Sequence, residues 1–119
     1  MKKILIIDDS PFIAMEIKNI VSEKGYEVIC HARSGEEGIR KFSELRPDIV
    51  TIDIIMPGID GIETAKGIKE ICPDARIIML SSLCDDDTMK ELQEAQLHFV
   101  ATKPIEKDKL IEILDLVSE

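Results

Sequence analysis

The sequence predicts a doubly wound α/β domain, in which helices cover both faces of a parallel sheet. Two observations support this prediction. Short β-branched apolar runs alternate with stretches of helical character along the chain, and this alternation is typical of consecutive βα units. The runs are also apolar at consecutive positions rather than at every second position, which favours strands that are buried on both faces, as parallel strands are.

Five of these apolar runs are candidate strands. They occupy residues 4–7, 28–30, 49–52, 77–80 and 99–101. Connections between consecutive parallel strands are right-handed in nearly all proteins, so five βα units would place helices on both sides of one sheet.

Capping signals mark the starts of the helices between these strands. Ser10 is an N-cap residue followed by a proline at the first helical position, a combination typical of helix starts. Ser34 and Asp60 each stand three residues before a glutamate, as in a capping box. The three aspartates at 85–87 would lie at the start of a fourth helix, where the helix dipole favours carboxylates.

Length and composition predict one globular domain covering residues 1–119. Hydrophobic residues make up 45% of the 119 residues and charged residues 33%, a balance typical of globular rather than disordered chains. No apolar run approaches the ~18 residues that a membrane span needs, and the apolar stretch after Lys3 is too short for a secretory signal. We therefore expect a cytoplasmic protein without membrane contact.

Charge and cysteine content exclude two further classes of protein. The net charge of −9 argues against direct binding to nucleic acid, because no stripe of Lys and Arg is present to neutralise phosphates. Cys30, Cys72 and Cys84 are odd in number and lack a CxxC pair. They are therefore expected to be reduced thiols rather than disulfides or metal ligands.

Polar residues stand where the predicted strands end. Asp8 and Asp9 follow the first strand, Asp53 the third, Ser81 the fourth and Lys103 the fifth. Each residue alone has a structural explanation, such as a helix cap, a turn or a solvated lysine. Together they would meet at the carboxyl edge of the sheet, where like charges disfavour ionisation unless a cation compensates them. An all-oxygen ligand set indicates a hard ion such as Mg²⁺.

The sequence resembles the response-regulator receiver domains over the entire chain, and among them the stand-alone chemotaxis regulators. The matching pieces are residues 6–10, 47–53 and 56–61, Ser81, and Lys103-Pro104. Each piece falls at a strand end of the family with the family's intervening lengths. The resemblance implies one receiver domain at 1–119 with a flavodoxin-like fold, strand order 2-1-3-4-5.

The resemblance also implies a role for each site residue. Asp53 would accept a phosphoryl group from the phosphohistidine of a histidine kinase, or from a small donor such as acetyl phosphate. Lys103 would neutralise one phosphoryl oxygen and the Ser81 hydroxyl would hydrogen-bond another. The cofactor would be Mg²⁺, bound directly by Asp9, Asp53 and the Ile55 main-chain carbonyl and through water by Asp8.

Two positions depart from the pattern of the family. Val100 stands where the family usually has an aromatic that turns inward on activation, and Phe99 would point to the opposite face of the strand. Residues 95–98 replace a short glycine-containing turn. Activation is therefore expected to depend on the Ser81 hydroxyl and on the loop at 83–87.

Other side chains near the expected site have smaller predicted roles. Ile55 and Leu83 are aliphatic and would keep water from the phosphoryl group, which would slow its loss. Gly61 would relax the turn into the third helix. His31 and His98 are interpreted as strand-edge or surface histidines.

Three classes of function compete. The first, a phospho-accepting switch that is not itself an enzyme, is the main prediction. The second is an Asp-dependent phosphohydrolase, although its usual Asp-x-Asp-Gly-Thr is here Asp8-Asp9-Ser10-Pro11. The third is a constitutive adaptor; a flavodoxin-like cofactor binder is weaker still, because no phosphate-cradling loop follows the first strand.

The output of the switch would pass through protein contacts, with the chain expected to be a monomer. A flagellar-motor switch protein is the first expected partner. The alternatives are a phosphotransferase in a phosphorelay, or a receiver excised from a larger regulator.

Overall fold

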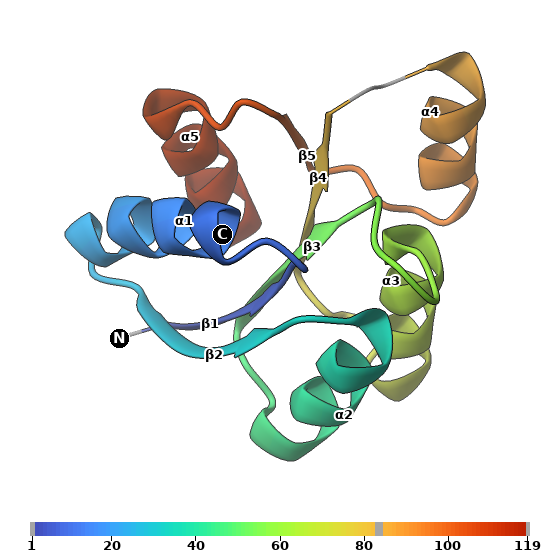
Figure 1. Ribbon diagram of the computed structural model, residues 1–119, viewed down its shortest axis with the longest axis horizontal. Coiled ribbons are helices and arrows are strands. Elements are labelled where there is room, and N and C mark those ends of the chain that lie inside the picture. Colours follow the sequence, from blue (N-terminus) through green and yellow to red (C-terminus); the bar gives the residue numbers. More distant parts are fainter. Residues whose placement is uncertain (1, 83–84, 119) are drawn as a thin grey trace.

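One parallel sheet lies between two layers of helices in the computed structural model, which describes residues 2–82 and 85–118 (Figure 1). The strands are β1 (Lys3–Ile7), β2 (Glu27–Ala32), β3 (Ile49–Asp53), β4 (Ile77–Ser81) and β5 (Val100–Thr102). The helices are α1 (Pro11–Glu23), α2 (Gly35–Leu45), α3 (Gly61–Ile71), α4 (Asp86–Glu94) and α5 (Lys107–Ser118). The strand order is β2-β1-β3-β4-β5, so the predicted fold class and topology are confirmed.

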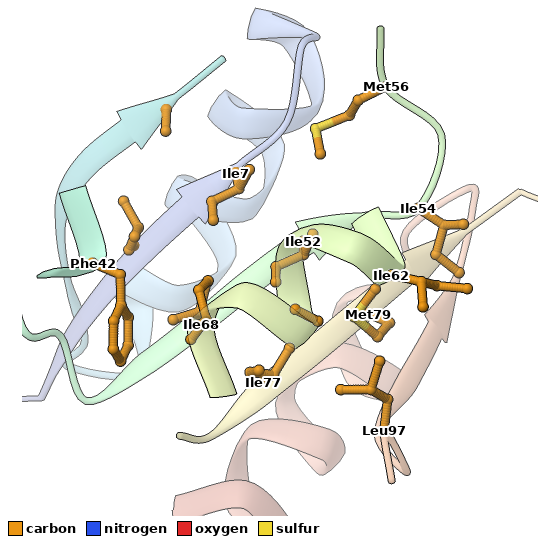
Figure 2. Close-up of a cluster of buried hydrophobic side chains, with 14 of the residues drawn as sticks. Ile7, Phe42, Ile52, Ile54, Met56, Ile62, Ile68, Ile77, Met79 and Leu97 are labelled. Carbon is orange, nitrogen blue, oxygen red and sulfur yellow. The ribbon is translucent and has the colours of Figure 1, made fainter. Parts of the chain in front are cut away.

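Helices α2 and α3 cover one face of the sheet (Figure 1). Alternate strand residues such as Ile7, Ile52 and Met79 pack there against Phe42 of α2 and Ile68 of α3 (Figure 2). Leu92 of α4 and the following Leu97 extend the same cluster toward β5. This face is a continuous apolar layer, which is the main source of stability in a domain of this kind.

Helices α1 and α5 cover the opposite face. Ile6 and Ile78 point to this side and pack against Ile17 of α1 and Leu114 of α5. Strands β1, β3 and β4 are therefore buried on both faces, as the consecutive apolar runs predicted.

The two edge strands differ from that expectation. Residues 28–31 of β2 are only half-buried, and β5 has one buried residue, Ala101. Each edge strand has a neighbour on one side only, so solvent reaches part of its surface. Phe99 and Val100 pack against opposite apolar clusters, which confirms the prediction that Phe99 points to the opposite face of the strand.

The predicted N-caps are confirmed. The side chains of Ser10, Ser34 and Asp60 each accept a hydrogen bond from the main-chain amide three residues later. The Glu37 carboxylate accepts from the Arg33 amide at 2.7 Å instead of closing a reciprocal capping box. None of the described helices combines the length and apolar content needed to cross a membrane.

Three predictions concern residues outside the described part of the chain. They are the free thiol of Cys84, the shielding role of Leu83 and the role in activation of the loop at 83–87, whose first two residues are not described. Cys30 and Cys72 are free and half-buried, as expected for reduced thiols.

Candidate functional site

The carboxyl ends of four strands bring together the polar residues that the sequence singled out. Asp8 and Asp9 follow β1 directly, and Asp53 and Ser81 are the last residues of β3 and β4. Lys103 follows β5, and its main-chain amide donates to the Ser81 carbonyl at 2.8 Å. The site lies between β1 and β3, where the strand order reverses and where doubly wound proteins form their binding sites.

Three carboxylates form one acidic cluster, defined here as Asp8, Asp9 and Asp53. Oxygen atoms from all three lie within 4.8 Å of one another. Asp8 and Asp53 are buried, whereas Asp9 is exposed. The predicted convergence of these three side chains is therefore correct.

Lys103 is the cation that faces this cluster. Its Nζ lies 3.0 Å from Asp53 Oδ2 and 3.8 Å from Asp8 Oδ2, and its side chain is 19% exposed. The Lys103–Pro104 peptide bond is cis. One ammonium against three carboxylates leaves the site with an excess of negative charge.

The pKa of the Asp8 carboxyl group is raised in this environment. Burial raises its pKa above the ordinary 3.8, the charges of Asp53 and Asp9 add to this increase, and the Ser10 amide and the Lys103 ammonium oppose it. Asp8 Oδ1 accepts from the Ser10 amide at 2.8 Å. Asp8 Oδ2 is buried and has no hydrogen-bond partner among residues 2–82 and 85–118.

These features fit a hard divalent cation. Each cluster residue offers an oxygen ligand, and Mg²⁺ is bound through one or two carboxylates together with water molecules. Asp8 Oδ2 has no hydrogen bond within the described residues, and its ion pair with Lys103 spans 3.8 Å. This is a further sign, because a buried carboxylate oxygen without a hydrogen bond is costly. A cation, or the water bound to it, would satisfy this oxygen.

The loop after β3 is held close to Asp53 by main-chain contacts. The Ile55 amide donates to Asp53 Oδ1 at 3.3 Å, and the Gly61 amide donates to the Ile54 carbonyl at 2.8 Å. A Cβ atom on Gly61 would lie 2.6 Å from Ile54 Cα and closer still to the Asp53 carbonyl oxygen.

The expected role of Gly61 was therefore wrong in its mechanism. Gly61 permits this close approach, while the positive φ in the loop belongs to Gly58, at 83°. The turn thus uses two glycines for two different reasons, a left-handed backbone at one and a missing side chain at the other.

Two more predicted residues lie beside the cluster. Ser81 is buried at the end of β4. Ile55 is 65% exposed and stands next to the acidic cluster. The metal-ligand role of the Ile55 carbonyl and the phosphoryl-binding role of Ser81 remain predictions.

The sequence reading missed one contact with the site. His31 was interpreted as a strand-edge histidine, and its Nε2 lies 2.7 Å from the Asp8 carbonyl oxygen. The only signal in the sequence was the position of His31 near the end of the strand that would pair with the strand before Asp8.

The fold and the site together define a class of protein. It is the class of doubly wound α/β domains with an acidic cluster and a facing lysine at the switch point of the sheet.

Comparisons with known proteins agree with this class. A family model described as the response regulator receiver domain matches residues 4–115. The chain belongs to this family.

Similar proteins include two chemotaxis regulators. The chemotaxis protein CheY of Thermotoga maritima is 39% identical over 118 residues, which cover 99% of this chain and 98% of that protein. CheY of Bacillus subtilis is 38% identical, over 95% of this chain and 94% of that protein. A chain in the crystal structure of a CheX–CheY–BeF3–Mg²⁺ complex from Borrelia burgdorferi superposes with a TM-score of 0.92 at 32% identity, covering 98% of this chain and 88% of that one. These relatives support a response regulator of the chemotaxis type.

Proposed function

We propose that this chain is a two-component switch in which Asp53 accepts a phosphoryl group and thereby changes the surface offered to other proteins. The observation that carries the proposal is the position of Asp53. Its carboxylate is buried within the acidic cluster and lies 3.0 Å from the Lys103 ammonium. A carboxylate nucleophile needs charge neutralisation on the phosphoryl oxygens around it, and the facing lysine supplies part of that neutralisation.

The metal ligands in this proposal are those of the receiver family. Asp9, Asp53 and the Ile55 carbonyl would hold Mg²⁺ directly, and Asp8 would contact it through water. The ion would supply positive charge against the phosphoryl oxygens during transfer. Asp8 Oδ2, buried and unsatisfied among the described residues, supports a water or an ion at that position.

The chemical step is a transfer between two protein side chains. An Asp53 carboxylate oxygen attacks the phosphorus of a phosphohistidine, so one P–O bond forms and the P–N bond breaks. The donor imidazole leaves with the electron pair of that bond and is protonated by solvent. Lys103 and the Ser81 hydroxyl would each bind an oxygen of the transferred group.

The phosphoryl donor in this proposal is a histidine kinase. A flagellar-motor switch protein is the first proposed effector, and a phosphotransferase in a phosphorelay is the second. The Borrelia structure contains a CheY in complex with CheX, BeF3 and Mg²⁺, which supports a protein partner for this receiver. We further propose that residues 1–119 act as one cytoplasmic domain, monomeric before modification, that catalyses only its own phosphorylation and dephosphorylation.

The test is modification of the purified protein with acetyl phosphate and Mg²⁺, followed by intact mass spectrometry. The wild type should gain one phosphoryl group, and Asp53→Asn, which keeps the shape and removes the nucleophile, should gain none. A stable adduct on Asp53→Asn would contradict the assignment. Sustained turnover of p-nitrophenyl phosphate would favour the phosphohydrolase alternative instead.

The metal assignment has its own test. Asp9→Ala should lose Mg²⁺ binding and keep the fold, because removal of one carboxylate also relieves repulsion within the cluster. Unchanged Mg²⁺ affinity in Asp9→Ala, measured by amide shifts in NMR titration, would show that the ligand set is wrong.

A further inference from the structure

The imidazole of His31 connects the edge strand β2 to the acidic cluster. The ring is half-buried and lines a cavity of about 330 Å³ between β2 and the start of α1, together with Pro11 and Met15. Its Nε2 lies 2.7 Å from the Asp8 carbonyl oxygen. A carbonyl oxygen can only accept, so Nε2 carries the proton and donates this hydrogen bond.

This bond replaces one that the sheet does not supply. The Asp8 amide still follows the parallel ladder and donates to the Ala32 carbonyl at 3.0 Å. Strand β2 ends at Ala32, and no main-chain amide within residues 2–82 and 85–118 donates to the Asp8 carbonyl. The side chain of His31 therefore gives the Asp8 carbonyl the donor that a continued strand would have given.

This hydrogen bond also affects the position of Asp9. The Asp8 carbonyl and the Asp9 amide belong to one planar peptide unit, so a fixed carbonyl also fixes the direction in which the chain enters Asp9. The Asp8 and Asp53 carboxylates each accept a hydrogen bond from a main-chain amide, and each forms an ion pair with Lys103. Within residues 2–82 and 85–118 the Asp9 carboxylate has neither, and its direction depends on the backbone.

We propose that His31 is a positioning residue for the acidic cluster, acting through the hydrogen bond from its Nε2 to the Asp8 carbonyl. The bond holds the Asp8–Asp9 peptide so that the Asp9 carboxylate faces Asp8 and Asp53. This inference rests on the proposed function, in which these three residues surround Mg²⁺. Outer groups that orient metal ligands typically contribute about 10- to 100-fold in metal affinity.

The experiment compares three variants at one fixed pH. His31→Phe keeps a ring of similar size without a donor, and His31→Gln keeps a side-chain N–H donor without the ring. Ile29→Ala trims the wall of the same cavity without touching a polar group, and it is the control for loosening of β2. Mg²⁺ affinity is measured by NMR titration, and amide hydrogen exchange is measured on the metal-free proteins.

The expected result is a loss of about tenfold in Mg²⁺ affinity in His31→Phe, with recovery to near the wild-type value in His31→Gln. The amides of Asp8 and Ser10 should exchange faster in metal-free His31→Phe, while the Gly61 amide on the β3 side of the site keeps its protection. Ile29→Ala should leave both measurements unchanged.

Two results would overturn the inference. One is wild-type exchange at Asp8 and Ser10 in His31→Phe. The other is Ile29→Ala reproducing the effects of His31→Phe, because a general loosening of β2 would then explain them. A wild-type protein that binds no Mg²⁺ would contradict the proposed function, and in that case the exchange measurements on the metal-free proteins still decide the role of His31.

Discussion

The Lys103 ammonium lies 3.0 Å from Asp53 Oδ2, across the gap between the ends of β5 and β3. The same ammonium is 3.8 Å from Asp8 Oδ2, so one positive charge serves two buried carboxylates. A second cation at this site would be attracted by the acidic cluster and repelled by Lys103. The lysine therefore has opposite effects on metal binding and on phosphoryl transfer.

Lys103→Met should separate these two effects. Loss of the ammonium removes repulsion toward Mg²⁺, so metal affinity should rise by about threefold or more. It also removes one of the charges that stabilise the transferring phosphoryl group, so phosphorylation by acetyl phosphate should slow by at least about tenfold. NMR titration with Mg²⁺ and time-resolved mass spectrometry measure the two quantities.

Lys107→Met is the matched control for this prediction. Lys107 forms an exposed ion pair with Glu23, away from the acidic cluster, and its removal should change neither quantity. If Lys103→Met weakens Mg²⁺ binding, the ammonium organises the carboxylates rather than competing with the metal.

Asp8→Asn should change how stability depends on pH in the metal-free protein. Burial raises the pKa of Asp8 in the folded protein above 3.8, so above pH 3.8 there is a range in which the folded protein retains a proton that the unfolded chain has released. The folded state then binds more protons, and Asp8 makes the free energy of unfolding fall as pH rises through this range. Asparagine removes that contribution.

At neutral pH, metal-free Asp8→Asn should therefore be more stable than the wild type, by roughly 1 kcal/mol or more. Urea unfolding at several pH values between 4 and 8 with a chelator present measures the difference. The gap between the two proteins should widen with pH. A variant that is less stable than the wild type at neutral pH would show that the ion pair with Lys103 outweighs the cost of burial.

Two buried threonines test how the hydrogen bonding of a buried hydroxyl group affects the stability of the core. Thr51 Oγ1, in β3, is buried without a partner among the described residues, whereas Thr64 Oγ1, in α3, donates to the Asp60 carbonyl at 2.8 Å. Thr51→Val should raise the free energy of unfolding by about 1 kcal/mol, and Thr64→Val should lower it by about the same amount. Equal effects from the two isosteric changes, measured by urea unfolding, would contradict the assignment of Thr51 as unsatisfied.

The fold class and the acidic cluster were predictable because both follow from local patterns, whereas the strand order was implied by the resemblance to the receiver family. Consecutive apolar residues indicated buried parallel strands, and Asp8, Asp53 and Lys103 stood directly at the predicted strand ends. The carboxyl ends of parallel strands meet at one edge, so their convergence needed no knowledge of long-range packing. The N-caps at Ser10 and Asp60 could be predicted for the same reason, since each depends on residues within one helical turn.

The contacts of Gly61 and His31 could not be predicted because they depend on the path of a loop and on the register between two strands. The sequence shows that Gly61 stands at the start of a helix, but not that its Cα faces the Asp53 carbonyl. The extra residue in β2 opposite Ile4 and Leu5 also shifts which side chains of that strand reach the end of β1. A strand pattern alone could not place His31 against Asp8.

The last prediction concerns the lifetime of the phosphorylated state and uses the side chain of Ile55. Ile55 stands two residues after Asp53, its amide donates to Asp53 Oδ1 at 3.3 Å, and its side chain is 65% exposed. An aliphatic side chain there offers no hydrogen bond to an incoming water. We expect slow loss of the phosphoryl group in the wild type, because alignment of the attacking water is a large part of the barrier.

Ile55→Asn combined with Leu83→Glu should speed dephosphorylation by about tenfold or more, which corresponds to about 1.4 kcal/mol in the barrier. The new amide and carboxylate can hold a water that the aliphatic side chains cannot. Leu116→Asn, an equally polar change at an exposed position on α5, is the control and should leave the rate unchanged. The measurement is loss of the phosphoryl group from purified proteins at saturating Mg²⁺ after removal of the donor. Equal rates in the wild type and the double variant would mean that Ile55 is an exposed contact for a partner rather than a barrier to water, even with Asp53 established as the site of modification.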